Sequence, residues 1–400
     1  MKIQFLITQD IESPSGLGRF FPMARELTKK GHQVTISALH PSFNSLNQKS
    51  FYKEGVRINY IAPMYVKKYG NSKDYYPLFR FVPIAIWEII AFLLVIIKEN
   101  ADLLFVGKPH PMNTLPAFFL RLFNNKKIWV DCDDYEAATN RFQKKWQYTI
   151  ISSVERYFVP RGNYISANTQ FMVQKAIAWG GKPENVLYLP NGIDIERFPI
   201  NDQSELSKIK DEIGFNEKPI VGFVGSISFT SHPVDLLVSA FSIVASRLPE
   251  VRLLLVGGGE NFSDLKRLVD KLGLFEKVYF TGRVSPEEAG KYYKIMTVSI
   301  DPVHDNTVAA SRSPLKMFES WHCGVPFVTG DVGDRRLLSG DPPASMIVPP
   351  GDVENLANAI VTIITNAELS NKLRLLGYER VKNFSWSNLI STIEPKVKNL

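Results

Sequence analysis

The sequence predicts an α/β protein built from two doubly wound parallel sheets. Its 400 residues suffice for two domains at a typical ~150 residues each. Short runs rich in Val, Ile and Leu alternate with segments of helical periodicity, which is typical of parallel strands buried on both faces. The alternation occurs in two series separated by a cluster of turn residues, which indicates two separate sheets.

The two series define the expected domains. Strand-like runs of the first series cover residues 3–7, 34–38, 56–61, 103–106, 128–130, 164–167 and 186–189. Those of the second cover residues 220–224, 252–256, 278–280, 298–300, 326–328 and 346–348. A turn at 190–194 (PNGID) and the polar stretch 201–218 separate them. We therefore expect two Rossmann-like domains, residues 1–192 and 193–384.

Composition excludes several classes of protein. The apolar fraction of 45% and charged fraction of 22% are those of a folded globular chain, neither disordered nor fibrous. The two cysteines, Cys132 and Cys323, are too few for a disulfide framework or a cysteine zinc site, which favours the reducing cytosol. The first residues enter a strand pattern, not that of a signal peptide, so we expect a cytoplasmic protein.

The net charge of +7 is concentrated in the first half of the chain. Residues 1–200 hold 25 Lys and Arg against 16 Asp and Glu, whereas residues 201–400 hold 22 against 24. A basic domain is typical of proteins that meet nucleic acid or the anionic inner leaflet of a membrane, although basic surfaces also simply aid solubility. Because no nucleic-acid recognition motif accompanies the charge, we expect the membrane surface and not nucleic acid.

One segment, residues 81–97, departs from the α/β pattern. It is apolar except for Pro83 and Glu88, and cations precede it at Lys67, Lys68, Lys73 and Arg80. A spanning helix needs ~20 apolar residues without a central charge, so a membrane span is the least favoured interpretation. The pattern favours a buried helix, with a helix lying in the membrane interface as the main alternative.

Two glycines, Gly16 and Gly18, lie between the first strand and the following helix. Glycines at such a turn let backbone N–H groups approach a phosphate at the positive end of the helix. The dinucleotide fingerprint is incomplete here, because a third glycine at the required spacing is missing from the sequence. A plain tight turn therefore remains the alternative to a ligand loop.

Three carboxylates follow the strand at 128–130, in the sequence Asp131-Cys132-Asp133-Asp134. Parallel sheets bind ligands at this end of their strands. Adjacent carboxylates repel each other, so their pKa values rise unless cations relieve them, which suits a general base or a metal site. An exposed helix cap is the alternative interpretation. His110 follows the preceding strand and could reach the same edge of the sheet.

The segment 311–319 (SRSPLKMFE) contains an electrostatic conflict. Ser313 and Pro314 are typical of a helix cap and first turn, yet Arg312 and Lys316 place positive charge at that helix N-terminus. A bound diphosphate resolves this conflict. Glu319, one turn later, is suited to accept hydrogen bonds from the sugar hydroxyls of a nucleotide.

Several short motifs occur in an order that resembles a known family. They are the Gly16 turn, residues 189–194 (LPNGID), 222–226 (GFVGS), 255–259 (LVGGG), 280–284 (FTGRV), Glu319, 323–326 (CGVP) and 384–386 (FSW). In this order and spacing the chain resembles the retaining glycosyltransferases of family 4. The resemblance implies the GT-B fold, in which two Rossmann-like domains face each other across a cleft and a C-terminal helix, here 385–400, crosses back to the first domain.

The resemblance also implies a division of labour between the domains. A UDP- or GDP-linked sugar donor binds mainly to the second domain and the acceptor to the first, without a metal ion or other cofactor. Glu319 would bind the ribose, and the backbone near Arg283 and Val284 the base. Gly16 and Gly18 would line the diphosphate and the transferred sugar. The sugar is transferred with retention, on one face, and the departing phosphate helps to take the acceptor proton.

This chain departs from the family at three donor positions. Where relatives carry an Arg after the glycine that matches Gly225, this chain has Ser226; a usual Lys is His232, and a usual Glu is Ser311. We keep Gly225, Ser226 and Ser311 as donor-binding residues. We hypothesise that Arg312 and Lys316 replace the missing cations, because the charge on the leaving diphosphate must still be offset.

The acceptor side differs as well. Asp133 stands where many relatives carry a His near the reaction centre, so we give it a catalytic role, with Asp134 as the second choice and His110 as its partner in acceptor binding. We expect a transferase that moves a sugar to a lipid-linked or polysaccharide acceptor in the assembly of cell-surface glycans. The alternatives are an inactive scaffold that binds nucleotide or glycan and a metal-dependent transferase, which the second Rossmann-like series argues against.

Overall fold

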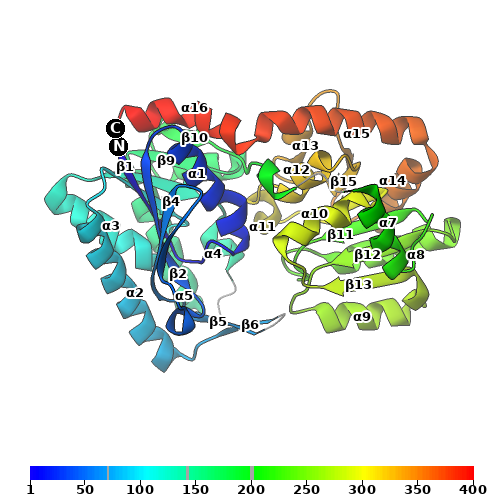
Figure 1. Ribbon diagram of the computed structural model, residues 1–400, viewed down its shortest axis with the longest axis horizontal. Helices are drawn as coiled ribbons and strands as arrows, with labels where there is room; N and C mark the ends of the chain where they lie inside the picture. Colours follow the sequence, from blue (N-terminus) through cyan, green and yellow to red (C-terminus); the bar gives the residue numbers. More distant parts are fainter. Residues whose placement is uncertain (70–71, 141–143, 199–201) are drawn as a thin grey trace.

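The computed structural model describes residues 1–69, 72–140, 144–198 and 202–400. These form two largely parallel sheets, each covered by helices and lying beside the other (Figure 1). The N-terminal sheet has the order β10-β9-β8-β7-β1-β2-β4-β3. Its strands are β1 (Lys2–Ile7), β2 (Gln33–His40), β3 (Ser50–Lys53), β4 (Val56–Pro63), β7 (Leu103–Gly107), β8 (Lys127–Cys132), β9 (Tyr164–Ala167) and β10 (Val186–Tyr188).

The C-terminal sheet has the order β13-β12-β11-β14-β15-β16 and is parallel throughout. Its strands are β11 (Ile220–Val224), β12 (Arg252–Val256), β13 (Val278–Gly282), β14 (Val298–Asp301), β15 (Phe327–Gly330) and β16 (Met346–Val348). Every strand-like run of both series therefore forms a strand. The sequence did not predict antiparallel β3 or the hairpin β5 (Val66–Tyr69) and β6 (Ser72–Tyr75), which lack the apolar character of the buried strands.

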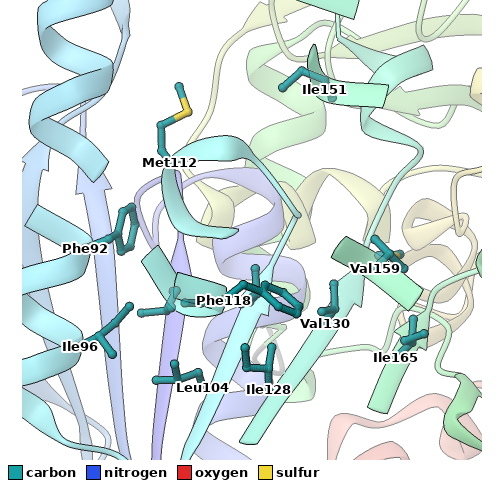
Figure 2. Packing of buried hydrophobic residues seen from close by; sticks show 14 of the residues in the cluster. Phe92, Ile96, Leu104, Met112, Phe118, Ile128, Val130, Ile151, Val159 and Ile165 are labelled. Carbon is teal, nitrogen blue, oxygen red and sulfur yellow. The ribbon is translucent and has the colours of Figure 1, made fainter. Parts of the chain in front are cut away.

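Helices cover both faces of the N-terminal sheet. One face packs against α2 (Leu78–Glu99), α3 (Pro111–Asn124), α5 (Lys145–Phe158) and α6 (Gln170–Ala178). Figure 2 shows this core, where Phe118 of α3 lies beside the strand residues Ile128 and Val130, and Phe92 and Ile96 of α2 lie to one side of them. The other face packs against α1 (Phe21–Lys29) and α16 (Trp386–Lys398).

The remaining helices lie mainly in the C-terminal half of the chain. Those of the C-terminal half are α7 (Gln203–Glu212), α8 (Val234–Arg247), α9 (Phe262–Lys271), α10 (Pro286–Lys294), α11 (Thr307–Ala310), α12 (Leu315–His322), α13 (Arg335–Ser339), α14 (Val353–Thr365) and α15 (Ala367–Val381). Short α4 (Glu136–Thr139) follows the carboxyl end of β8 and contacts α11 of the second domain.

The C-terminal helix returns to the first domain, as predicted. Beyond α15 the chain passes beside the first interdomain connection: Ile193 N donates to Phe384 O at 2.8 Å, and Ile193 bridges to Ser385. Helix α16 then packs on α1 along the top of Figure 1. Both connections thus cross between the sheets at one place, where the predicted boundary after residue 192 falls. The start of the predicted polar stretch, Asn201, lies outside the described residues.

Helix α2 corrects the expectation for residues 81–97. Its inner stripe is buried, with Glu88 and Phe92 at 0% exposure and Ile96 at 1%. Its outer stripe is exposed, with Leu94 at 61% and Ile90 at 49%. The prediction of a buried helix is therefore right for one face and wrong for the other, because apolar residues occur all around this helix.

Candidate functional site

The two domains meet where the glycine turn contacts α12. A β-carbon added at Gly18 would lie 2.8 Å from Leu315 Cδ2, so this turn has room for backbone only. Gly18 O accepts a hydrogen bond from Trp386 Nε1 at 3.0 Å, which ties the turn to the returning helix α16. Gly16 N donates to Ser13 Oγ at 3.1 Å. The turn is a short π-helical segment (Gly16–Phe20) that opens directly into α1.

Lys316, in the first turn of α12, lies at the carboxyl end of the C-terminal sheet. Its Nζ is 3.1 Å from His232 Nδ1 and 3.3 Å from Asp301 Oδ1. A β-carbon at Gly225 would lie 2.7 Å from Lys316 Cε, so the lysine stem crosses the turn after β11. The structure thus places Lys316 beside Gly225 and His232, next to the positions where the family's cations were expected.

A buried carboxylate, that of Asp301, forms an ion pair with Lys316. Asp301, at the end of β14, also accepts from Arg335 Nη2 at 2.9 Å. Burial alone would raise the pKa of Asp301, but Lys316 and Arg335 outweigh it and lower that pKa below its usual range. Burial lowers the pKa of Lys316, an effect that Asp301 partly offsets. Burial and the nearby Lys316 lower the pKa of His232 well below its usual value, which keeps its imidazole neutral at pH 7.

Arg312 reaches across the domain boundary. Its Nε lies 3.5 Å from Asp134 Oδ1, and its Nη1 donates to Ser231 O at 3.4 Å. The predicted cap of the helix is wrong in detail. α12 begins at Leu315, and the Ser313 hydroxyl instead accepts from Asn191 N at 3.0 Å in the interdomain connection. The segment 312–316 therefore carries both cations and a direct link between the domains.

Glu319 lies one turn further along α12, with its side chain 13% exposed. Its carboxylate accepts from Tyr293 Oη at 3.1 Å and is 3.9 Å from Arg197 Nη2. Burial raises the pKa of Glu319, against the opposing effects of Arg197 and Tyr293. The carboxylate is thus partly paired but accessible.

The other predicted donor residues differ in accessibility. Ser226 follows β11 and Arg283 follows β13, and both are exposed. Val284 is half-buried and packs against the core under α12. Ser311 is fully buried, and its hydroxyl donates to Val308 O at 3.1 Å. Of the side chains predicted to bind the sugar donor, that of Ser311 is therefore the least accessible to a ligand.

On the N-terminal side, the ammonium group of Lys108 lies close to three carboxylates. Its Nζ lies 2.7 Å from Asp134, 3.3 Å from Asp133 and 3.3 Å from Glu136. Burial would lower the pKa of Lys108, but these carboxylates raise it well above its usual value. Burial raises the pKa of Asp134 in spite of Lys108 and Arg312. Asp133 is 5% exposed, so the interpretation of this cluster as an exposed helix cap is wrong.

His110 belongs to the same cluster through Glu136. Its Nε2 lies 3.0 Å from Glu136 Oε2, and the histidine is 5% exposed. Burial would raise the pKa of Glu136, but Lys108 and His110 outweigh it and lower that pKa below its usual range. The structure thus brings His110, Asp133 and Asp134 together as predicted. It adds Lys108 and Glu136, to which sequence reasoning gave no role.

Arg19 is a further residue that sequence reasoning missed. It is 1% exposed and pairs with both oxygens of Asp131, each at 2.7 Å. Its Nη1 also donates to Leu189 O and Asn191 Oδ1, each at 3.1 Å. Arg19 therefore connects the glycine turn, the end of β8 and the interdomain connection. Its place directly after Gly18 was visible in the sequence, but its partners, more than a hundred residues away, were not.

Within the described residues, no group of three or more His, Cys, Asp or Glu side chains is arranged to hold a metal ion. Of the three carboxylates at the end of β8, Asp131 is committed to Arg19, and the other two pair with Lys108. Cys132 and Cys323 are both free thiols.

Comparison with solved structures identifies the fold. Sucrose-phosphate synthase from Thermosynechococcus elongatus superposes with a TM-score of 0.78 at 17% identity, covering 100% of this chain and 98% of that one. Alr3699/HepE of Anabaena, in complex with UDP-glucose, gives 0.76 at 18% identity and covers 100% of both chains. Two Rossmann-like sheets joined at one crossing, with the last helix returned to the first domain, define a GT-B protein.

Sequence comparison narrows this class to a family. Residues 20–197 match the family model described as Glycosyltransferase Family 4, and residues 218–366 match that described as Glycosyl transferases group 1. The chain belongs to glycosyltransferase family 4.

Curated relatives match over part of their length. Mannosylfructose-phosphate synthase of Agrobacterium fabrum is 28% identical over 64% of this chain and 57% of its own length. A GDP-mannose-dependent phosphatidylinositol monomannoside mannosyltransferase of Mycolicibacterium smegmatis is 24% identical over 50% and 52%. The matched region thus spans little more than half the length of these relatives.

Proposed function

We propose that this protein is a retaining glycosyltransferase that moves a sugar from a UDP- or GDP-linked donor to a hydroxyl group of a lipid-linked or polysaccharide acceptor. The observation that carries the proposal is the pair of cations on segment 312–316. Lys316 lies over Gly225, and Arg312 reaches Asp134 of the other domain at 3.5 Å. A diphosphate seated between them would be offset by both charges.

Leaving-group stabilisation is the main chemical task of the donor side. As the bond between the sugar and the diphosphate breaks, negative charge grows on the leaving phosphate, and prepositioned cations stabilise that charge. Asp301 keeps Lys316 oriented and favours its charged form before the donor arrives. Glu319 accepts from the ribose hydroxyls, and the backbone near Arg283 and Val284 contacts the base. The reaction needs no metal, because the two side chains supply the positive charge.

Acceptor activation is the task of the N-terminal cluster. Asp133, 3.3 Å from Lys108, orients the acceptor hydroxyl and the departing phosphate helps to remove its proton. Asp134 and His110 bind other hydroxyls of the acceptor. Carboxylates accept hydrogen bonds from neutral sugar hydroxyls, so this cluster suits a glycan better than a second phosphate.

The proposal includes the place of action. The basic N-terminal half favours an anionic membrane surface, and the relative from Mycolicibacterium smegmatis is by its name a phosphatidylinositol monomannoside mannosyltransferase. We place the protein in the cytoplasm, peripheral on the inner face of the plasma membrane, in cell-surface glycan assembly.

Two measurements test the proposal. A thermal-shift screen against UDP- and GDP-linked sugars should show a donor that raises the unfolding temperature, because a ligand that binds only the folded state stabilises it. Slow release of free sugar from that donor, without acceptor, should follow from a working leaving-group site. Stabilisation without any hydrolysis or transfer would favour the alternative, a scaffold that binds nucleotide without catalysis. The absence of any stabilising donor would contradict the proposal.

A further inference from the structure

The outer side of α2 is a continuous apolar stripe. Six large apolar side chains, spaced three or four residues apart, are between 45% and 73% exposed: Phe79, Val82, Ile86, Ile90, Leu94 and Ile97. This spacing places them along one face of the helix. The opposite face is buried in the N-terminal core through Phe92 and Ile96.

Neighbouring helices extend the stripe into a wall. α2, α3 and α5 share one layer over the same face of the sheet, with their inner side chains in one core (Figures 1 and 2). On α3, Leu122 and Phe123 are 79% and 70% exposed. On α5, Trp146 and Tyr157 are 39% and 55% exposed. We call these outer faces of α2, α3 and α5 the apolar wall. In Figure 1, α2 and α3 lie on the side of the first domain that faces away from the second.

The exposed charges carried by the three helices of the apolar wall are mainly positive. The three helices carry Arg80, Lys98, Arg121, Lys145 and Arg156. Their acidic residues do not offset this charge at the surface. Glu88 and Glu155 are buried, and Glu99 pairs with Arg57 at 3.2 Å. The side chains of Lys67, Lys68 and Lys73, which precede α2, lie outside the described part of the chain.

We infer that the apolar wall docks into an anionic lipid bilayer, with α2 lying in the plane of the interface and its outer stripe among the acyl chains. Soluble monomers rarely expose so long a contiguous apolar surface. Apolar side chains bordered by cations match the chemistry of a bilayer that carries anionic headgroups. This inference deepens the proposed action at a membrane by naming the surface and its mode of contact, which is insertion and not charge alone.

Alternative arrangements of α2 do not fit its contacts. By length and composition alone the helix is apolar enough to cross a membrane. Crossing would remove Phe92 and Ile96, 0% and 1% exposed, from the core over β4, β1 and β2. A helix held in this way lies on a membrane and does not span it.

Vesicle flotation tests the inference with the full chain. We expect the protein to float with vesicles of phosphatidylglycerol and phosphatidylcholine, and part of it to remain bound when NaCl rises from about 0.15 M to about 1 M, because insertion is not screened by salt. The variants Leu94→Asp and Phe123→Asp should each lower partitioning by about tenfold or more. The matched control Leu375→Asp, which changes a 50% exposed leucine on α15, should leave it unchanged.

Tryptophan fluorescence gives an independent readout. Trp87 on α2 and Trp146 on α5 are 44% and 39% exposed, whereas Trp129, Trp321 and Trp386 are buried. Brominated lipids should therefore quench emission, and Trp87→Phe should reduce that quenching.

Three outcomes would overturn the inference. The protein would fail to float, or its flotation would be abolished by salt and insensitive to Leu94→Asp. In the third, the protein would form a dimer without lipid that Leu94→Asp converts to monomers. Donor stabilisation measured without vesicles reports on the proposed sugar transfer separately, so failure of one is distinguishable from failure of the other.

Discussion

The two halves of the site carry charges opposite to those of their domains. The N-terminal half of the chain holds an excess of nine cations, yet its cluster at the site is acidic, with three carboxylates around Lys108. The C-terminal half has two more acidic than basic residues, yet its part of the site presents Arg312 and Lys316. Net charge of a domain therefore does not predict the charge of its site.

The two halves of the site also differ in burial, which fits two different tasks. The acidic cluster is buried, and Arg19, Lys108 and His110 hold its carboxylates in place, as expected of groups that orient the hydroxyls of an acceptor. The cations of the donor side are partly exposed, at 24% for Arg312 and 14% for Lys316. Arg312 pairs with Asp134, which a phosphate could replace, whereas the buried Asp301 holds Lys316 in place. The excess positive charge of the first domain is then left for its outer surface.

The largest expected effect concerns the stability of the acidic side. Arg19→Ala leaves Asp131 buried without its partner, which should destabilise the fold by about 3–5 kcal/mol. Arg336→Ala is the matched control, because Arg336 pairs with Asp331 at the surface and its loss should cost less than about 1 kcal/mol. Chemical denaturation of both variants measures this. If both substitutions lowered the free energy of unfolding equally, the buried acidic cluster would contribute no more to stability than a surface ion pair.

The next effect concerns catalysis on the basic side. Lys316→Ala should raise the barrier of transfer by about 2–4 kcal/mol, roughly a thirty- to thousandfold loss of kcat, because a cation facing the leaving phosphate is lost. Lys271→Ala, at an exposed lysine of α9, is the control. Steady-state kinetics decides the matter. Turnover of Lys316→Ala within a fewfold of the parent would show that Lys316 does not replace the missing cations.

The third effect is a pH dependence of stability, caused by Glu155 beside the acidic cluster. Burial, with the neighbouring Glu136, raises the pKa of Glu155 from 4.5 to about 8. The folded chain therefore keeps a proton that the unfolded chain loses, so this group's contribution to stability is complete below pH 4.5 and declines as pH rises to about 8. Relative to Glu155→Gln, the free energy of unfolding should fall by at most about 1.4 kcal/mol per pH unit over this range. A constant difference between the two proteins across this range would contradict the raised pKa.

The smallest effect concerns the donor's sugar hydroxyls. Glu319→Gln keeps a hydrogen-bond acceptor but removes the charge, so the donor KM should rise by about fivefold to tenfold while kcat changes little. Measured KM and kcat with saturating acceptor test this. A fall in kcat with KM unchanged would move Glu319 from binding to chemistry.

The sequence predicted the sheets because buried parallel strands are short, apolar and bounded by turns. β11 and β12 illustrate this, since their predicted and observed bounds agree. The same criterion missed β3, which is an edge strand with exposed polar residues. It also misjudged α2, because composition alone does not say which apolar face of a helix finds a partner.

The proximity of the candidate site residues was predictable where they lie on one segment or directly after neighbouring strands. Arg312, Lys316 and Glu319 lie on one segment, and their position near Gly18 follows from the order of the motifs. Pairs such as Arg19 with Asp131 and Asp301 with Arg335 join distant strands and helices. Their side-chain contacts depend on the packed fold, so periodicity and spacing did not reveal them.

The central claim is that segment 312–316 binds the diphosphate of an activated sugar. A crystal structure of the complex with the nucleotide sugar that most stabilises the protein tests it most directly. We predict a diphosphate oxygen within about 3 Å of Lys316 Nζ, with Arg312 turned from Asp134 toward the phosphate. A diphosphate bound away from α12, with the Arg312–Asp134 pair intact, would contradict this prediction.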